Sequence, residues 1–328
     1  MFEKISKRLE ELKEKALSGE GIDREDALWL MNLPEAANKE VLDIASEVRE
    51  QYFSNAVDLC SIVNAKSGLC GEDCAFCAQS RVSSADIERY SLISPEGIIA
   101  AAETAQKNGA RRFGIVTSGR SVSTKELQRI CEIAAEIRER VGIEVDLSSG
   151  LIERKGAEML KEAGISHYNH NLETTPERFS KICTTHSFDE RLNTLRILQE
   201  AGIELCCGGI FGMGETDTDR VELAFLLREL GVKSIPMNFL HPIPGTPLEN
   251  MPRLNPTIAL RIIAAFRLIN PCATIRVCGG KEYVLGEYQR LIFQAGASGT
   301  MVGNYLTTTG NLPEEDHRII TEAGMRVI

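Results

Sequence analysis

The feature that most constrains the fold of this chain is a regular alternation of short β-branched runs with longer helical stretches. Eight runs have the length and composition of strands, at residues 57–65, 111–118, 143–149, 165–172, 203–211, 233–240, 274–280 and 297–303. Helical stretches such as "STKELQRICEIAAEIRERVG" and "FDERLNTLRILQEAG" lie between them and end at a glycine, a common helix stop. Strands that alternate with helices predict parallel βα units.

Eight βα units close naturally into a TIM-type (β/α)8 barrel, whose usual length is about 250 residues. We therefore expect an α/β barrel with a C-terminal segment over residues 56–328. Residues 1–55 carry helical patterns and no strand pattern, so we expect an N-terminal helical extension there. An open doubly wound sheet is the alternative, because one sequence does not give the order of the strands. In a barrel, the active site lies in the loops that follow the strands.

Composition and charge narrow the class of protein. The formal net charge is −10, which argues against nucleic acid binding through the general surface. No apolar run approaches the roughly 20 residues needed to cross a bilayer, and the first residues form a charged amphipathic pattern unlike a signal peptide. We therefore expect a cytoplasmic protein without a membrane partner. Its ten cysteines then suit metal ligands, catalytic groups or small buried residues better than disulfides.

Three of these cysteines are crowded into the stretch "SGLCGEDCAFCAQS", in the loop after the first predicted strand: Cys70, Cys74 and Cys77. A structural zinc site usually has four ligands in two separated pairs, and no histidine stands at ligand spacing here. Three thiolates instead match a [4Fe–4S] cluster in which one iron has no protein ligand. A small molecule can chelate such an open iron. A zinc or storage site is the alternative interpretation.

The spacing C-x3-C-x2-C, with Phe76 before the last cysteine, resembles the signature of radical S-adenosylmethionine (SAM) enzymes. In that superfamily, the amino and carboxylate groups of SAM chelate the open iron. An electron from the cluster cleaves SAM to methionine and a 5′-deoxyadenosyl radical, which abstracts hydrogen. The resemblance implies that the cofactors carry the difficult chemistry, while the protein positions them and excludes water.

A second informative stretch is "YNHNLET", at the end of the fourth predicted strand. Alternation along a strand places Asn169, Asn171 and Glu173 on one face, with His170 and Leu172 on the other. Two amides and a carboxylate at the mouth of a barrel suit a ligand rich in hydroxyl, urea or amide groups. The alternative is a polar strand end that is satisfied by its own loop.

From about Leu59 to Glu315 the chain resembles the biotin synthase family. The likeness includes "SGLCGEDCAFCAQS", "YNHNLETTPE", "FDERLNTL", "GGIFGMGET", "PMNFLHPIPGTPLE" and "NYLTTTGNLPEED", in this order. It implies the conversion of dethiobiotin to biotin by sulfur insertion, with two hydrogen abstractions and one SAM consumed for each. The nearest alternative is a related radical SAM enzyme of the hydrogenase-maturase or methylornithine-synthase type. An alternative from another class is a non-enzymatic iron–sulfur carrier.

The resemblance also implies roles for individual residues. For SAM, it implies that Asn171 and Glu173 contact the ribose and that Arg191 lies against the carboxylate. The backbone at Ile210 would contact the adenine, and Phe76 would lie beside the cluster. Glu173 stands where the family more often has Asp. For Arg191, the alternative interpretation is a salt bridge on the surface of a helix. The residues expected to hold the ureido ring of dethiobiotin are Asn169, Asn171 and Asn238, since an amide both donates and accepts hydrogen bonds.

The family also needs a second sulfur-containing centre. Its best-known members hold a [2Fe–2S] cluster with three cysteines and an arginine, and the matching positions here are Gly114, Asp146, Cys206 and Arg276. Glycine offers no ligand, and a carboxylate is a hard ligand poorly suited to a sulfide cluster. The resemblance therefore implies a different centre, with a [2Fe–2S] cluster the less favoured type.

Other cysteines stand on the predicted strands: Cys60 on the first, the adjacent Cys206 and Cys207 on the fifth, and Cys272 and Cys278 around the seventh. We expect Cys60, Cys206 and Cys278 to bind an auxiliary iron–sulfur cluster near Arg276, of four irons with an extra sulfide, as is thought for some anaerobes of the family. Cys207 and Cys272 are reserve candidates. The alternative is that these are small buried residues, which is also the expectation for Cys131 and Cys183. By analogy we expect a flavodoxin or ferredoxin as electron donor and a homodimer.

Overall fold

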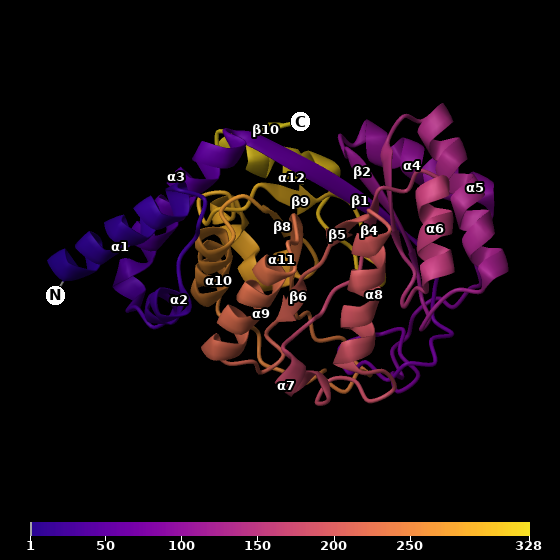
Figure 1. Ribbon diagram of the computed structural model, residues 1–328, viewed down its shortest axis with the longest axis horizontal. Helices are drawn as coiled ribbons and strands as arrows, with labels where there is room; N and C mark the ends of the chain where they lie inside the picture. The colour runs from indigo at the N-terminus through magenta and orange to yellow at the C-terminus, as the bar shows by residue number, and fades with distance from the viewer. Residues whose placement is uncertain (1) are drawn as a thin grey trace.

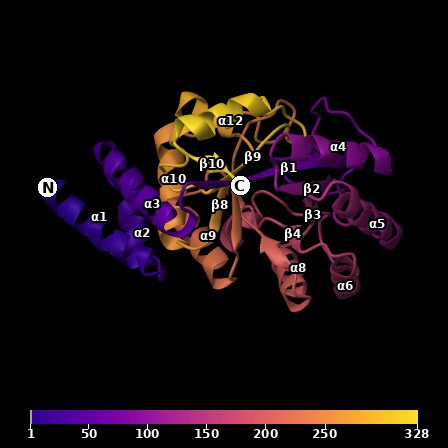
Figure 2. The same cartoon turned by 90° about the horizontal axis from the view of Figure 1, so that it is seen from above.

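The computed structural model describes residues 2–328, and its chain begins with three α-helices before any strand (Figure 1). These are α1 (Phe2–Leu17), α2 (Arg24–Met31) and α3 (Asn38–Phe53), with the 3-10 turn η1 (Glu35–Ala37) between the last two. They pack against α9 (Asp217–Glu229) and α10 (Pro256–Ile269), as Figure 2 shows from above. The helical character expected for this region is present. The domain boundary between residues 55 and 56 stays a prediction.

The strands form a closed parallel barrel. Within the described residues they are β1 (Ala56–Lys66), β2 (Arg112–Thr117), β3 (Glu144–Ser148), β4 (His167–Asn169), β5 (Glu204–Cys206), β6 (Gly209–Phe211), β7 (Ser234–Phe239), β8 (Thr274–Val277), β9 (Gly299–Met301) and β10 (Arg326–Val327). The order runs β1-β2-β3-β4-β5-β7-β8-β9, and β9 pairs again with β1. This closure confirms the TIM-type barrel and shows that the open doubly wound sheet is wrong.

The helices that follow the strands surround the barrel (Figure 2). The remaining helical segments are α4 (Pro95–Lys107), α5 (Thr124–Arg140), α6 (Arg154–Glu162), α7 (Pro176–Phe179), α8 (Phe188–Glu200), α11 (Lys281–Leu285), η2 (Gly286–Leu291) and α12 (Pro313–Glu322). The two barrel helices quoted from the sequence, α5 and α8, each begin with a capping box, from Ser123 to Glu126 and from Ser187 to Glu190. Such boxes satisfy exposed backbone N–H groups and fix where each helix starts.

The predicted fifth strand is interrupted. It forms β5 and β6, which both pair with β7 on either side of a break at Cys207 and Gly208. A Cβ atom on Gly208 would lie 1.9 Å from the carbonyl oxygen of Pro236, so only glycine fits there. The close approach of two backbones therefore explains the break.

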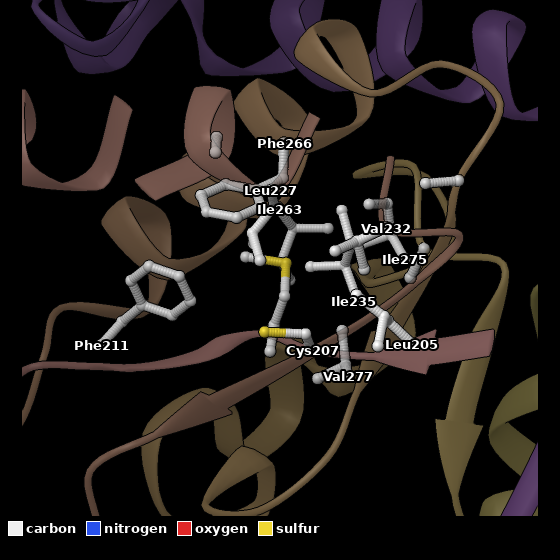
Figure 3. Close-up of a cluster of buried hydrophobic side chains, with 14 of the residues drawn as sticks. Leu205, Cys207, Phe211, Leu227, Val232, Ile235, Ile263, Phe266, Ile275 and Val277 are labelled. Atoms are coloured by element: carbon white, nitrogen blue, oxygen red, sulfur yellow. The ribbon is translucent and has the colours of Figure 1, made fainter. Parts of the chain in front are cut away.

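The core between barrel and helices is mainly aliphatic. Figure 3 shows one part of it, where Cys207 lies among Ile235, Val277 and the helical residues Leu227 and Phe266. Cys207 is fully buried there. The side chain that follows Cys206 in sequence thus faces the helices, as strand alternation requires of one of the two.

The C-terminal residues form a short strand that the sequence pattern does not predict. In β10, Arg326 and Val327 pair with Ala56 and Val57 at the start of β1. The end of the chain is thereby attached to the amino-terminal end of the first barrel strand (Figure 1). The catalytic face of a barrel is the opposite, carboxyl end.

Candidate active site

A cavity of about 360 Å³ lies inside the carboxyl end of the barrel. It is lined by most of the side chains singled out from sequence: Cys60, Phe76, Cys77, Asn169, Asn171, Glu173, Cys206, Ile210, Asn238, Arg276 and Cys278. Among the residues that the structure describes, Cys70, Cys74 and Arg191 are the site candidates outside this lining. The barrel therefore brings together groups from several strands, from β1 to β8, in one cavity.

The three-cysteine loop leaves β1 through a tight turn. Gly68 and Leu69 both have positive φ, and the main-chain N–H of Gly68 donates to the side-chain oxygen of Gln79 across 2.8 Å. The loop then presents Cys77 to the cavity, where burial raises the pKa of its thiol to about 11. Soft thiols gathered on one loop at the barrel mouth fit the donor set of an iron–sulfur cluster.

Cys74 lies on the other side of the loop, against Cys183. The two sulfur atoms are 3.8 Å apart, and their hydrogen bond lowers the pKa of Cys183 to about 4 while raising that of Cys74. Cys183 also lies 3.2 Å from Nδ1 of His186. The expectation that Cys183 is simply a small buried residue is therefore incomplete: it is buried, but it belongs to a polar cluster. The histidine, far from the loop in sequence, was missed.

The polar strand end after β4 enters the cavity with Asn169, Asn171 and Glu173, while His170 is buried outside the lining. This is the division between faces that strand alternation predicts. Glu173 has a φ of 69°, in the left-handed region, and its main chain pairs with Gly209. Asp tolerates that region better than Glu does, which gives a backbone reason for the more frequent Asp.

The carboxylate of Glu173 is the clearest sign of a missing partner. Its Oε2 atom is buried and has no hydrogen-bond partner within residues 2–328, and burial raises the pKa of the group. A buried polar atom without a partner is costly, so a hydroxyl donor bound in the cavity would stabilise it. The ribose of SAM provides such donors. The residues present therefore fit that cofactor.

Arg191, on α8, approaches the same place from outside. Its Nη1 atom donates to the main-chain oxygen of Asn171 and lies 4.0 Å from Oε1 of Glu173, while Nε donates to Nε2 of His186 across 3.0 Å. Its guanidinium also lies over the ring of Phe179. Arg191 is thus fixed beside the cavity, with its positive charge next to the residues that follow β4.

The two remaining amides line the deeper wall. Asn238 accepts from the N–H of Gly279 at 3.0 Å and donates to the main-chain oxygen of Gly209 at 3.4 Å. Asn169 donates to the main-chain oxygen of Cys206 at 3.4 Å and to its sulfur at 3.5 Å. These bonds do not use the full capacity of either amide, which has two donors and one acceptor. Both side chains retain groups for a ligand in the cavity.

Three thiols converge below these amides. Cys60 from β1, Cys206 from β5 and Cys278 after β8 line the cavity together with Arg276. A hydrogen bond from Cys278 is the main cause of a lowered pKa at Cys60, and the charge of Arg276 acts in the same direction, while the pKa of Cys278 is raised. Cys60 and Cys278 are therefore close enough to form a hydrogen bond, and the cation of Arg276 lies beside them.

The two positions that lack a cysteine lie side by side on neighbouring strands. Gly114 and Asp146 are paired in the register of β2 and β3, and both line the cavity. A Cβ atom on Gly114 would lie 3.1 Å from Cγ2 of Ile62, so this wall has little room for a side chain. Asp146 is buried, and burial raises the pKa of its carboxyl group.

The two reserve candidates, Cys207 and Cys272, are not among the described residues that line the cavity. Cys207 is in the core between barrel and helices, and Cys272 is exposed in the turn before β8. Cys272 is not part of the strand on which it was expected, because β8 begins only at Thr274. All ten cysteines are free.

One further group at the cavity was missed from sequence. Tyr305 lines the cavity and donates to the carboxylate of Glu282 across 2.8 Å. It belongs to the loop after β9, whose residues Leu306, Thr307 and Thr308 also reach the cavity. Tyr305 is part of the stretch "NYLTTTGNLPEED", which is named above only for its resemblance to the family.

Comparison with known proteins shows which families this chain resembles. Residues 66–227 match the radical SAM superfamily, and residues 236–326 match the biotin and thiamin synthesis associated domain. The chain is 48% identical over 320 residues to a biotin synthase of Geotalea daltonii, covering 97% of each chain. It is 47% identical over 319 residues to a biotin synthase of Geobacter sulfurreducens, again covering 97% of each.

The chain belongs to the biotin synthase family. It is accordingly a radical SAM enzyme, and membership of the family implies a [4Fe–4S] cluster and SAM. Solved structures agree on the fold: methylornithine synthase has a TM-score of 0.85 at 21% identity, covering 97% of each chain. The [FeFe]-hydrogenase maturase of Carboxydothermus hydrogenoformans has a TM-score of 0.83 at 19% identity, covering 99% of this chain and 80% of its own. At such identities these likenesses show the barrel alone, so the biotin synthase assignment is favoured over the alternatives.

The helices of the structure also bear on whether the chain could span a membrane. No helix within residues 2–328 is both long and apolar enough to span a bilayer.

Proposed function

We propose that this chain converts dethiobiotin to biotin by inserting a sulfur atom, using a radical derived from SAM. The observation that carries the proposal is the composition of the cavity inside the carboxyl end of the barrel. It joins Cys77 of the three-cysteine loop, amides suited to a cyclic urea, and three further thiols. The reaction requires a binding site for SAM, one for the substrate and a source of sulfur close together, and the cavity offers residues for each.

Cys70, Cys74 and Cys77 are the proposed ligands of the [4Fe–4S] cluster. When bound, the cluster and SAM together supply the 5′-deoxyadenosyl radical. The residues of the chain hold SAM in place: Asn171 and Glu173 at the ribose, Arg191 at the carboxylate, and the backbone at Ile210 at the adenine. The unpartnered Oε2 atom of Glu173 supports the ribose contact.

The ureido ring of dethiobiotin is the proposed partner of Asn169, Asn171 and Asn238. An amide matches a cyclic urea because each can donate and accept. A substrate held inside the barrel would be partly shielded from water by the barrel wall. The free hydrogen-bonding groups on Asn169 and Asn238 support this placement.

Cys60, Cys206 and Cys278 are the proposed ligands of an auxiliary iron–sulfur cluster that provides the sulfur. A four-iron cluster with an extra sulfide suits the site better than a [2Fe–2S] cluster, because Gly114 has no ligand atom and Asp146 is a hard oxygen donor. Arg276 contributes positive charge next to the thiolates.

The remaining proposals concern the setting of the enzyme. A flavodoxin or ferredoxin is the proposed electron donor, and Leu69, an exposed apolar side chain beside Cys70, supports an approach to the cysteine loop. A cytoplasmic location is supported by the ten free cysteines. We also propose a homodimer, by analogy with relatives, and a boundary between the helical extension 1–55 and the barrel region 56–328.

The test is to incubate the anaerobically reconstituted, reduced protein with SAM and dethiobiotin and to analyse the products by mass spectrometry. Biotin and 5′-deoxyadenosine are expected together. Formation of 5′-deoxyadenosine without biotin would favour another radical SAM reaction, whereas intact SAM would contradict the proposal as a whole.

The auxiliary centre needs a separate measurement. Counts of iron and sulfide should reach about eight irons per chain, four for each of two clusters. A count of about four, unaltered by Cys206→Ala, would contradict the second centre while leaving the SAM cluster intact.

A further inference from the structure

The cluster of Cys74, Cys183 and His186 has the composition of a site for a single metal ion. One ligand atom from each residue lies within 4.8 Å of the others, and all three side chains are largely shielded from solvent. Cys183 and His186 stand three residues apart in the segment after α7, while Cys74 comes from the loop after β1. Two thiols and an imidazole are preferred ligands of zinc.

The spacing of the ligand atoms agrees with tetrahedral coordination. Thiolates bound at about 2.3 Å from a tetrahedral ion lie about 3.8 Å apart. The sulfur atoms of Cys74 and Cys183 are 3.8 Å apart, and Nδ1 of His186 is 3.2 Å from the sulfur of Cys183. Two edges of the triangle formed by the three ligand atoms are thus close to those of a tetrahedral site, and the third, between the ligand atoms of Cys74 and His186, is within 4.8 Å.

Acidic groups surround these three ligand atoms and favour a cation. Glu72 accepts a hydrogen bond from Nδ1 of His186, and Oδ1 of Asp73 lies 3.3 Å from the sulfur of Cys183. Asp73 already accepts from the main-chain N–H groups of Thr184 and Thr185, whereas Glu72 is held by side chains alone. Glu72 is therefore the carboxylate that can turn to a metal ion, with water as the other source of a fourth ligand.

Metal binding changes the protonation of the histidine. Nε2 of His186 now accepts from Nε of Arg191, so the proton of the ring is on Nδ1. A metal at Nδ1 moves that proton to Nε2, and Arg191 must then turn away from the ring. The ion therefore affects two proposed functions, through Cys74 and through Arg191.

We propose that the protein without its cluster binds one divalent transition-metal ion, zinc in preference to iron, at Cys74, Cys183 and His186. The preference follows the general order of affinities for nitrogen and sulfur ligands. Because Cys74 is also a proposed ligand of the [4Fe–4S] cluster, the ion and the cluster exclude one another. The ion-binding part stands independently of the proposed function, and only the exclusion rests on it.

The test uses the full chain, freed of iron by a chelator under anaerobic, reducing conditions. It should bind one equivalent of zinc tightly, and cobalt in its place should give the intense absorption of thiolate coordination. Cys183→Ala and His186→Gln should each weaken zinc binding at least about tenfold. Cys131→Ala is the matched control, since it removes a buried thiol on α5 that contacts none of the three residues, and its affinity should equal that of the parent.

Two outcomes would overturn the site. One is an unchanged zinc affinity in Cys183→Ala, checked with Cys183→Ser in case the alanine variant fails to fold by circular dichroism. The other is a loss in Cys70→Ala as large as that in Cys183→Ala, because the ion would then lie on the three-cysteine loop.

The exclusion has its own readout. Cluster assembly from ferrous iron and sulfide, followed by absorption, should be slowed by one equivalent of zinc in the parent but not in Cys183→Ala, which keeps all three proposed cluster ligands. Equal inhibition of both would contradict the exclusion. None of these measurements uses SAM or dethiobiotin, so failure of this proposal and failure of the proposed reaction are distinguishable.

Discussion

Arg276 is tied to Asp58 by a buried ion pair, with Nη2 of the arginine 2.9 Å from Oδ2 of the aspartate. Nη1 also donates to the main-chain oxygen of Asp58 across 2.9 Å. A cation from β8 is therefore fixed to β1, next to the thiols of the cavity. Removal of Asp58 would leave the buried guanidinium of Arg276 without its ion-pair partner.

Asp58→Asn should lower the free energy of unfolding by about 3–5 kcal/mol, the usual cost of breaking a buried pair. Chemical denaturation followed by circular dichroism measures this. Asp43→Asn, at an exposed pair with Lys39, is the control and should change stability by less than about 1 kcal/mol. Equal effects of the two variants would contradict the importance of the buried pair.

The same pair predicts a pH dependence. Burial acts to raise the pKa of Asp58, but the charge and hydrogen bond of Arg276 outweigh burial, with further help from Arg112, and the pKa is lowered on folding. The pair thus stabilises the folded protein fully above the ordinary carboxyl pKa of about 3.9, and this contribution is lost as the pH falls through the lower folded value. Asp58→Asn should show a smaller loss of stability between neutral and acidic pH. An unchanged slope would argue against the assignment.

Adjacent cysteines provide a matched test of the auxiliary centre. Cys206→Ala should lower the iron content by about four per chain, because the side chain faces the cavity. Cys207→Ala should leave the iron content unaltered and cost about 1 kcal/mol of stability, because that side chain is in the core. Iron analysis and thermal unfolding on both variants are the measurements. The reverse pattern would show that the inward face of the strand is misassigned.

Glu173 offers a test of SAM binding. Glu173→Gln should weaken the affinity for SAM about tenfold or more, because an amide accepts hydrogen bonds from hydroxyl groups less strongly than a carboxylate. Glu173→Asp should retain most of the affinity, and Glu177→Gln, at an exposed position nearby, should retain all of it. Equilibrium dialysis of the cluster-loaded protein measures each. Full affinity in Glu173→Gln would place the ribose elsewhere.

Gly208 tests the explanation of the broken strand. Gly208→Ala should destabilise the protein by about 3 kcal/mol or more, because its Cβ atom meets the carbonyl oxygen of Pro236 at 1.9 Å. Gly97→Ala, whose added atom makes only ordinary contacts at 3.6 Å, is the control. Thermal unfolding compares the two. Similar midpoints would show that the strand break has another cause.

Much of this fold is predictable because the signals are local. The β-branched runs and the helix stops mark each βα unit, and the barrel then forces cysteines on distant strands to share one interior. The break in the fifth strand was not predicted, because it arises from the approach of Gly208 to a neighbouring strand. Likewise, β10 is too short to carry a pattern, and its partner lies at the other end of the chain.

The candidate site, like the fold, has parts that local motifs predict and parts that depend on contacts between distant segments. The cysteine loop and the strand end with Asn169 and Asn171 are continuous motifs, so their placement in one region follows from sequence. The contact between Cys74 and Cys183 joins residues 109 positions apart and depends on how two loops fold together. The spacing of Cys183 and His186 was visible in "CTTH", but nothing local indicates which third residue they meet.

The pairing of β10 with the start of β1 has a consequence for biosynthesis. β1 is the first barrel strand to be translated, and β2 follows it, yet the partners of β1 on the other side, β9 and β10, are the last strands to be translated. Until β9 has been synthesised, this edge of β1 has no partner and the barrel is open. Closure of the barrel, and with it the shape of the cavity, is therefore a late event in the folding of the nascent chain.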